Sequence, residues 1–241
     1  MIELKKVELW KRSVEAISSF ISEGNFRFNE KGIQFRAIDP SQVVLVNYEM
    51  NKNVFDKYEI EPTFVGVDLG ELSKIMSRVL PNDKLVMDLT DSELLIKLEG
   101  DLSRSFRLPL IDVSEEDITM PLHKYAAKIE INSRILKEAL KDASLFGSSV
   151  ILRLKGGQFL IEARGSAGSL NISSKESKAI SVTGNNKEIV SKYSLNYLMN
   201  IVKESDNEKK VVLEMKTDTP IKVSYKIGDS EIQFYLAHMI L

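Results

Sequence analysis

The sequence predicts an α+β protein made of two similar halves, each with two helices packed on β-sheet. Three observations predict this fold class. Four units, each a helix followed by a hairpin, follow one another along the chain; their hairpin turns alternate between two types; and an acidic segment without periodicity separates the second unit from the third. Because an amphipathic helix must bury its apolar stripe, we expect both helices of each half to lie on one face of a sheet.

The first unit begins with a helix over residues 9–21. Its apolar side chains recur at helical spacing, at Trp10, Val14, Ile17 and Ile21. Residues 26–29 and 33–37 then alternate apolar and polar side chains, which is the period of a half-buried strand. The turn between them ends at Gly32, a residue that accepts a positive φ.

The second unit has a helix over residues 68–80. Its apolar stripe consists of Leu72, Ile75, Met76 and Leu80. Asp68 is the expected N-cap, with Glu71 at capping-box spacing, and Pro81 is expected to end the helix. The hairpin turn is Thr90-Asp91-Ser92-Glu93.

The third and fourth units repeat this arrangement. The third helix, over residues 132–146, is capped by Asn132 or Ser133, and the residues expected to face inward are Ile135, Leu136, Ala139, Leu140 and Ala143. The turn that follows is Lys155-Gly156-Gly157. The fourth helix, over residues 194–205, has the stripe Leu195, Leu198, Met199 and Val202, and its hairpin turns through Thr217-Asp218-Thr219-Pro220.

The turn types divide the units into two pairs. The first and third turn through Lys-Gly, and the second and fourth through Thr-Asp, so the chain repeats as A-B-A′-B′. Helix–hairpin units are common in α+β proteins, but their shared order and paired turns favour a duplication over coincidence. We therefore expect an N-terminal domain over residues 1–111, a connector over residues 112–124 and a C-terminal domain over residues 125–241. The connector carries Glu115, Glu116 and Asp117.

Composition excludes several classes of function. The net charge of -2 excludes a uniformly basic nucleic-acid binder, although a local basic face remains compatible with it. The absence of cysteine excludes disulfides and zinc–cysteine sites, and the only histidines are His123 and His238. No P-loop, EF-hand loop or nucleophile elbow is present, so we expect no enzyme activity, no metal and no cofactor. An enzyme that depends on carboxylates is the alternative class, and convergent acids in a pocket would favour it.

The ends of the chain and its hydropathy point to a soluble intracellular protein. The first ten residues, MIELKKVELW, lack the apolar region of a signal peptide. No stretch approaches the roughly 20 apolar residues that span a bilayer, so we expect no membrane partner.

Four segments resemble one family. The run from Phe35 to Leu45, FRAIDPSQVVL, resembles the family's strand-to-loop run Met-Asp-Ser-Ser-His-Val-Ser-Leu. The run from Pro220 to Ile227, PIKVSYKI, resembles Pro-Leu-x-Val-x-Tyr-x-Ile, and YLAHMI before Leu241 is similar to Tyr-Leu-Ala-Pro-Lys-Ile. The connector ending at Met120-Pro121 is similar to an interdomain connecting loop. Over its whole length the chain thus resembles the proliferating cell nuclear antigen (PCNA) family of DNA sliding clamps.

The resemblance implies two topologically equivalent clamp domains in each subunit and a trimeric ring of six domains around duplex DNA. It implies a processivity factor that tethers replication and repair enzymes without reading sequence. The implied partners are DNA polymerase, flap nuclease, DNA ligase and the clamp loader, bound through short peptide motifs, together with other clamp subunits. The location would be cytoplasmic and nucleoid-associated in an archaeon, or nuclear in a eukaryote. The alternatives are a paralogous subunit that functions only in a heterotrimer and a checkpoint-type clamp.

In such a ring the polar faces of the helices line the hole. The cations that would contact phosphates are Lys11, Arg12, Lys74, Arg78, Lys137, Lys141 and Lys203. Arg78 follows Ser77, which stands where the family has a lysine, and Glu138 stands in place of a family arginine. Both departures predict a weaker positive field. From the residues alone, cations on a helix usually form no more than a solvated face.

The resemblance also implies a partner-peptide pocket that binds one helical turn with apolar anchors. Its residues would be Ile38, Pro40, Gln42, Val43, Leu45, Ile118, Thr119, Met120, Tyr125, Pro220, Tyr235, Leu236, Ala237, His238 and Ile240. His238 replaces a family proline, and its protonation at low pH would be unfavourable beside apolar anchors. For single residues such as Val43, Leu45 and Leu236, an ordinary core position is the competing interpretation.

Subunits of the family join through edge strands. Here these would be about Ser103 to Ile111 and about Lys175 to Val182, with interface residues Phe106, Leu108, Leu110, Lys178 and Ile180. Such head-to-tail contacts must close into a ring, and they pair edges that would otherwise aggregate.

Overall fold

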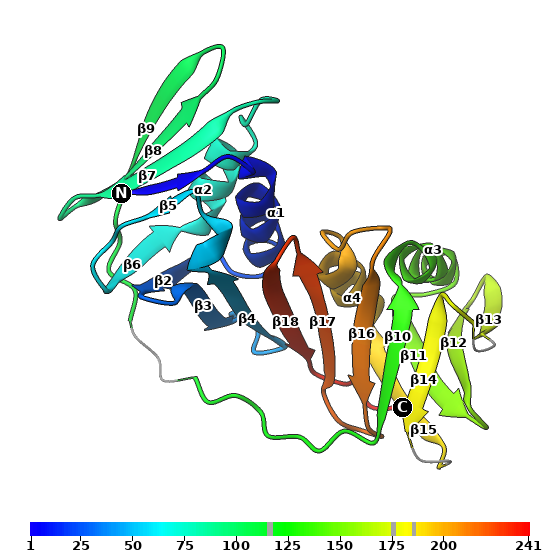
Figure 1. Ribbon diagram of the computed structural model, residues 1–241. Helices are drawn as coiled ribbons and strands as arrows, with labels where there is room; N and C mark the ends of the chain where they lie inside the picture. Colours follow the sequence, from blue (N-terminus) through cyan, green and yellow to red (C-terminus); the bar gives the residue numbers. More distant parts are fainter. Residues whose placement is uncertain (115–117, 175–176, 185–186) are drawn as a thin grey trace. The chain divides into compact units, whose positions relative to one another are not determined.

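The computed structural model describes residues 1–114, 118–174, 177–184 and 187–241 (Figure 1). The chain divides into two compact units. The first contains residues 1–42, 46–119 and 227–232, and the second contains residues 43–45, 120–226 and 233–241.

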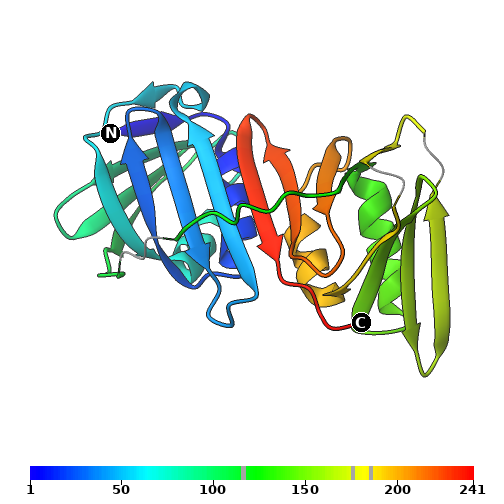
Figure 2. The ribbon, with the colours of Figure 1, turned by 90° about the horizontal axis from the view of Figure 1, so that it is seen from below.

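The first unit holds two helices and the first nine strands. In chain order they are β1 (Ile2–Leu4), α1 (Val7–Ser18), β2 (Glu23–Asn29), β3 (Gly32–Ile38), β4 (Val44–Asn51), the short 3-10 helix η1 (Lys52–Val54), β5 (Lys57–Tyr58), β6 (Thr63–Asp68), α2 (Leu69–Met76), β7 (Lys84–Leu89), β8 (Glu93–Glu99) and β9 (Ser103–Pro109). One sheet has the order β5-β1-β7-β8-β9, and a second run of neighbours has the order β4-β3-β2-β6. The strands of this second run lie side by side in blue to cyan in Figure 2.

The second unit holds the other two helices and the remaining strands, except that residues 227–232 of the last hairpin belong to the first unit. In chain order the elements are β10 (Ala127–Asn132), α3 (Ser133–Ser144), β11 (Ser149–Lys155), β12 (Gln158–Gly165), β13 (Gly168–Ser174), β14 (Ile180–Gly184), β15 (Ile189–Ser194), α4 (Leu195–Val202), β16 (Lys210–Met215), β17 (Ile221–Ile227) and β18 (Ser230–Leu236). One run of neighbours has the order β14-β10-β16-β17-β18, and a separate sheet has the order β13-β12-β11-β15.

The two strand orders are the same. Adding nine to each strand number of the first unit converts β5-β1-β7-β8-β9 into β14-β10-β16-β17-β18, and β4-β3-β2-β6 into β13-β12-β11-β15. The helices correspond as well, α1 to α3 and α2 to α4. The prediction of an α+β fold made of two topologically equivalent halves is therefore confirmed.

The predicted apolar stripe of the first helix is buried. Trp10, Val14, Ile17 and Ile21 are each exposed by 3% or less. The Trp10 ring lies 5.3 Å from that of Phe26, so the helix packs on β2 through large apolar surfaces. The helix itself ends at Ser18, three residues earlier than expected, but the N–H of Ile21 still donates to the carbonyl of Ile17 at 3.1 Å and keeps Ile21 on the stripe.

Four residues of the predicted stripes are not in the core: Ile75 and Met199 are half-buried, and Leu80 and Ile135 are exposed. Leu80 is 43% exposed because α2 ends at Met76, well before Pro81. The backbone after it tightens, since the N–H of Val79 donates to the carbonyl of Met76 at 3.1 Å, and helical spacing is lost before Leu80 is reached. Ile135 is 42% exposed because its neighbour Leu136 occupies the inward position of α3.

The helix caps fix where two helices begin. The carboxylate of Asp68 accepts the N–H of Glu71 at 2.9 Å, which confirms the predicted N-cap of α2. For α3 the cap is Asn132, whose side chain accepts the N–H of Ile135 at 3.3 Å, whereas Ser133 is buried. In the part of the chain described, no helix is long and apolar enough to cross a membrane.

Candidate nucleic-acid interface and protein-binding surfaces

The cations of the first unit lie on the outer faces of α1 and α2, two helices that contact each other. Lys11 is half-buried, and its Nζ lies 3.6 Å from the carboxylate of Glu8. Lys74 is exposed, and its Nζ lies 2.6 Å from Glu71. The hydrogen bond that Lys74 donates to Glu71 raises the pKa of Lys74, so this lysine stays charged over the whole neutral range.

The second unit repeats this pattern on α3. Lys141 is exposed, with its Nζ 2.7 Å from the carboxylate of Glu138. At the end of α4, Lys203 lies 3.9 Å from Glu204. Three helices therefore place a glutamate three residues before a basic residue. Exposed pairs of this kind contribute at most about 1 kcal/mol each, so the lysines can exchange a carboxylate for a phosphate at small cost.

Lys137 differs from the other cations because it holds the fold together. Its Nζ donates to the carbonyl of Ser205 at 2.7 Å and to the side chain of Asn207 at 2.9 Å. It thereby ties α3 to the loop after α4, and that tie keeps its charge from being freely available. Arg78 is exposed just beyond α2, and Arg12 is half-buried on α1.

Sequence reasoning missed the carboxylate partners. The structure pairs Lys11 with Glu8, a contact that was not predicted. The i,i+3 spacing of Glu8 and Lys11, of Glu71 and Lys74, and of Glu138 and Lys141 was the available signal.

The residues expected to form the partner-peptide pocket fall into both units. In the second unit, Leu45, Tyr235 and Leu236 are buried, and for these residues the core interpretation holds. The half-buried members of this group are Val43, Met120, Tyr125, Pro220, Ala237 and His238. Ile240 is 91% exposed. The N–H of Ala237 donates to the carbonyl of Val43 at 2.9 Å, which joins the tail to this segment.

Tyr125 has an apolar setting. Burial raises its pKa, and the nearby phenol of Tyr235 adds to the effect. The His123 ring meets the Tyr125 ring edge-on at 6.0 Å. A half-buried aromatic ring of this kind is the sort of surface that an apolar anchor contacts.

In the first unit, Ile38, Pro40 and Gln42 lie at or beside a tight turn. The N–H of Gln42 donates to the carbonyl of Asp39 at 2.8 Å, and Gln42 has a φ of 58°. The buried carboxylate of Asp39 accepts the N–H of Ser41 at 3.3 Å, which fixes the turn. Ile38, Pro40, Gln42 and Thr119 are exposed and Ile118 is half-buried. Glu115, Glu116 and Asp117 of the predicted connector lie outside the described residues.

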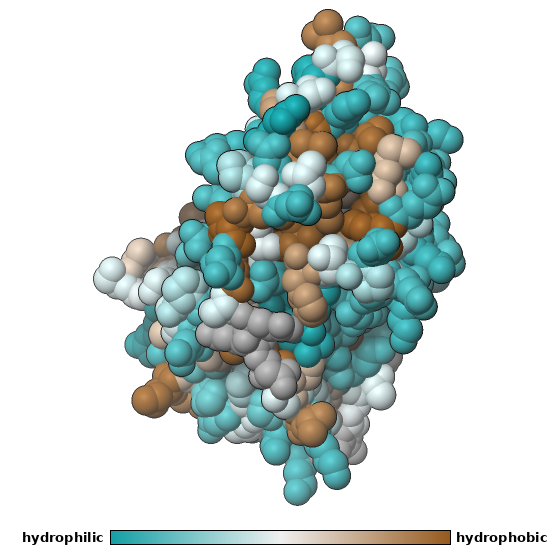
Figure 3. Space-filling view, turned by 90° about the vertical axis from the view of Figure 1, so that its left-hand side faces the viewer, coloured by the Kyte–Doolittle hydropathy of each residue, from teal (hydrophilic) through white to brown (hydrophobic). Residues whose placement is uncertain are grey.

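The first predicted interface strand is an edge of its sheet. β9 pairs with β8 alone among the described strands, and Phe106, Leu108 and Leu110 alternate with exposed residues along it. On the left-hand side of Figure 1, where β9 is labelled, apolar side chains gather at the centre of the surface and polar ones surround them (Figure 3).

The second predicted interface strand falls on a turn and on β14, an end strand that pairs with β10 alone among the described strands. Lys178 is exposed in the turn before β14, and Ile180 is buried in β14, opposite Ile131 of β10. Lys175 lies outside the described residues. A second free edge of this unit is β13, which pairs with β12 alone among the described strands.

No group of three or more side chains from His, Asp and Glu that could hold a metal ion occurs among the described residues. The glutamates of the helix faces, Glu8, Glu71, Glu138 and Glu204, each lie beside a lysine.

Comparisons with known proteins follow the same division into halves. Residues 1–116 match the model for the proliferating cell nuclear antigen N-terminal domain, and residues 119–240 match that for its C-terminal domain. DNA polymerase sliding clamp 1 of Thermococcus kodakarensis is 33% identical over 93% of this chain and 92% of its own. The DNA polymerase sliding clamps of Pyrococcus horikoshii, 33% identical over the same shares, and Methanococcus maripaludis, 30% identical over 96% and 95%, are similar relatives.

A solved structure agrees with these sequence matches. The crystal structure of PCNA from Thermococcus kodakaraensis superposes with a TM-score of 0.93, covers 99% of both chains and is 26% identical. The chain therefore belongs to the proliferating cell nuclear antigen family of DNA sliding clamps, and it is a processivity factor rather than an enzyme.

Proposed function

We propose that three subunits of this type close into a ring around duplex DNA and tether replication and repair enzymes to it. The observation that carries the proposal is the repetition of one fold within the chain, in a family whose members are named sliding clamps. Two equivalent domains that each present a pair of helices give a subunit whose repetition generates a pseudo-symmetric ring.

The helix cations suit a contact that slides. Lys11, Lys74 and Lys141 each share their charge with a glutamate, so their attraction for phosphate is weak and salt-sensitive. Arg12, Arg78 and Lys203 add charge without any cluster suited to reading base edges. Topology, not affinity, would then hold the clamp on DNA.

The partner enzymes would dock on the apolar residues of the pocket. Val43, Tyr125, Pro220 and the tail from Ala237 to Ile240 supply half-buried and exposed apolar surface in the second unit. We infer that DNA polymerase, flap nuclease, DNA ligase and the clamp loader place a short apolar motif there. Residues 112–124 would act as the connector between domains 1–111 and 125–241.

Subunits would join through the edge of β9. Both β14 and β13 have a free side among the described strands, and β13 is the better partner edge in the next subunit because its residues are exposed or half-buried whereas Ile180 of β14 is buried. Phe106 and Leu110, both half-buried in one unit, would become covered in the ring. The archaeal sources of the curated relatives support a cytoplasmic, nucleoid-associated protein.

The experiment that tests the assembly is the solution mass of the purified chain by light scattering over a concentration series. A species of about 82 kDa, three times the 27.2 kDa of the chain, would support a self-sufficient homotrimer. A persistent monomer would favour the paralogous subunit of a heterotrimer, and mixing with the other subunits would then have to restore the trimer. A chain that assembles under neither condition would contradict the ring.

A further inference from the structure

An open groove of about 610 Å³ lies on one face of the sheet β13-β12-β11-β15 in the second unit. Its walls combine two cations, one carboxylate, several hydroxyl groups and a little apolar surface. The residues that define it are Ser149, Ile151, Glu162, Arg164, Asn171 and Lys192. None of them belongs to the helix faces or to the pocket discussed above.

The equivalent face of the first unit is covered by the chain itself. After β9, the N–H of Ile111 donates to the carbonyl of Gly66 at 3.0 Å. The side-chain amide of Asn25 then donates a hydrogen bond to the carbonyl of Val113 at 3.0 Å. The guanidinium of Arg36 donates one to the carbonyl of Ile118 at 3.1 Å. Hollows of about 160 and 80 Å³ lie beside these residues, and Ile118 lines both. Ile111, Val113 and Ile118, which follow β9, therefore bind β6, β2 and β3 in turn, and we call these described residues a strap across the strands.

In the part of the chain that the structure describes, the second unit has the first hydrogen bond of this strap but not the rest of it. Lys192 occupies the position of Gly66, because Lys192 is paired with Ile151 as Gly66 is paired with Asn25. After β18, the N–H of Met239 donates to the carbonyl of Lys192 at 2.7 Å, as Ile111 does to Gly66. Among the described residues, however, none after Lys192 lines the groove, so its face is open where the first unit carries a strap.

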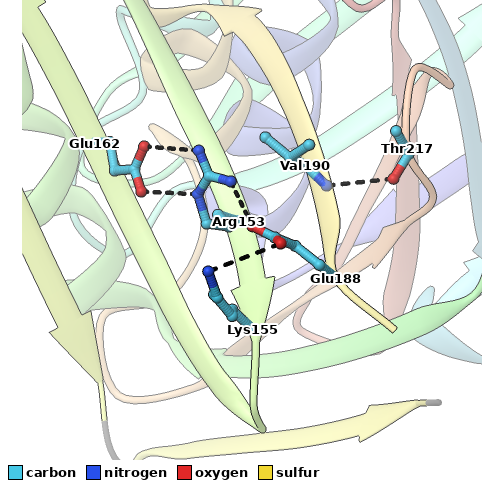
Figure 4. Close-up of polar contacts among 6 residues, drawn as sticks. All are labelled: Arg153, Lys155, Glu162, Glu188, Val190 and Thr217. Carbon is cyan, nitrogen blue, oxygen red and sulfur yellow. Dashed lines mark hydrogen bonds and ion pairs between the residues drawn. The ribbon is translucent and has the colours of Figure 1, made fainter. Parts of the chain in front are cut away.

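The charges that line the groove determine which kind of molecule it can bind. Glu162 is neutralised by Arg153, whose guanidinium nitrogens lie 2.8 and 3.2 Å from its two oxygens, and Arg153 also binds Glu188 at 2.6 Å (Figure 4). In the described part of the chain, Arg164 and Lys192 have no ion-pair partner. The groove thus presents two uncompensated positive charges, with Ile151 half-buried between them on the central strand.

We propose that this groove binds an extended acidic segment of a partner protein, which lies across the sheet as the strap does in the first unit. Four strands spaced about 4.8 Å apart span about 14 Å, which an extended segment crosses in four to five residues. Carboxylates of the segment pair with Arg164 and Lys192, and an aliphatic side chain contacts Ile151. Asn171 and Ser149 are placed to bind its peptide groups, as Asn25 binds Val113. The proposal does not depend on ring closure.

The test uses a fluorescein-labelled peptide with the sequence IDVSEEDITM, that of residues 111–120, as an acidic strap. Fluorescence anisotropy with the full chain should show binding that weakens as sodium chloride rises from 50 to 200 mM. A peptide with its four acids replaced by the corresponding amides should bind at least tenfold more weakly. The double variant Arg164→Glu with Lys192→Glu should lose at least tenfold in affinity for the acidic peptide.

The matched control is Lys216→Glu with Lys226→Glu, which makes the same charge change on exposed lysines of the second unit outside the groove. It should stay within twofold of the wild type. Thermal unfolding checks that each variant folds. If the charge-reversal variant does not fold, the double variant Arg164→Gln with Lys192→Gln removes the two charges without reversing them.

Three results would overturn the proposal. The first is equal binding of the acidic peptide to the wild type and the groove variant. The second is equal binding of the acidic and amide peptides. The third is binding of inorganic phosphate that depends on Arg164 and Lys192 while the peptide does not bind, which would make the groove a site for small anions.

Discussion

Replacing Glu8, Glu71 and Glu138 by glutamine should strengthen the binding of DNA. Each substitution keeps the shape of the side chain and removes the carboxylate that lies 3.6, 2.6 or 2.7 Å from a helix lysine. An exposed pair contributes about 0.2–1 kcal/mol, so releasing three lysines removes about 0.6–3 kcal/mol of competition for phosphate. At the lower bound this is about a threefold gain in affinity.

The assay is fluorescence anisotropy of a labelled duplex, titrated with the triple variant at several salt concentrations. The slope of log affinity against log salt should steepen by about 0.9 for each phosphate newly neutralised. The control variant changes Glu30, Glu61 and Glu99, which are exposed and lie outside the helices, to glutamine. If the control gains as much affinity as the helix variant, or if neither gains any, the helix lysines do not face DNA.

Three further predictions concern stability, each read as the free energy of unfolding in denaturant. Asp83→Asn should cost about 3 kcal/mol, because the buried Asp83 carboxylate pairs with Arg104 and its loss leaves that guanidinium mostly buried without a counter-charge; an effect below 1 kcal/mol would contradict this. Asn132→Ala should cost about 1 kcal/mol through loss of the α3 cap, and an unchanged value would show that the cap is dispensable. Burial raises the pKa of Tyr48 from 10.0 to about 12, so the folded state keeps a proton that the unfolded state loses. The wild type should be fully stable below pH 10 and lose up to about 3 kcal/mol between pH 10 and 12, and Tyr48→Phe should remove that part of the loss.

The repeat and the fold class could be predicted because they depend on periodicity. The spacing of apolar residues predicted the helix stripes that pack on the sheets. The Lys-Gly and Thr-Asp turns indicated which of the four helix–hairpin units correspond to each other. The ends of the helices were less predictable, because backbone turns after Met76 and competition between Ile135 and Leu136 for one inward position are decided by tertiary packing. Pattern alone could not separate those outcomes.

The sites were predicted unevenly. The sequence shows which cations lie on a helix face. Whether such a lysine can bind a phosphate depends on contacts with residues far along the chain, such as the hydrogen bond from Lys137 to Ser205. Leu45 and Leu236 have the hydropathy of pocket residues, and the structure shows that both are buried, which hydropathy alone does not reveal. The open groove could not be predicted, since it arises from the comparison of two equivalent faces. Nothing in the sequence says that one carries a strap.

The central claim is that the assembled clamp holds DNA by encircling it. The most direct test lets the trimer thread onto a linear duplex with biotin at both ends, blocks the ends with streptavidin, and measures the protein retained after a wash in high salt. The account predicts retention on the blocked duplex, release when a restriction enzyme cuts it, and loss from an unblocked duplex. Equal retention on blocked and unblocked DNA, or no release on cutting, would show ordinary surface binding and contradict the ring.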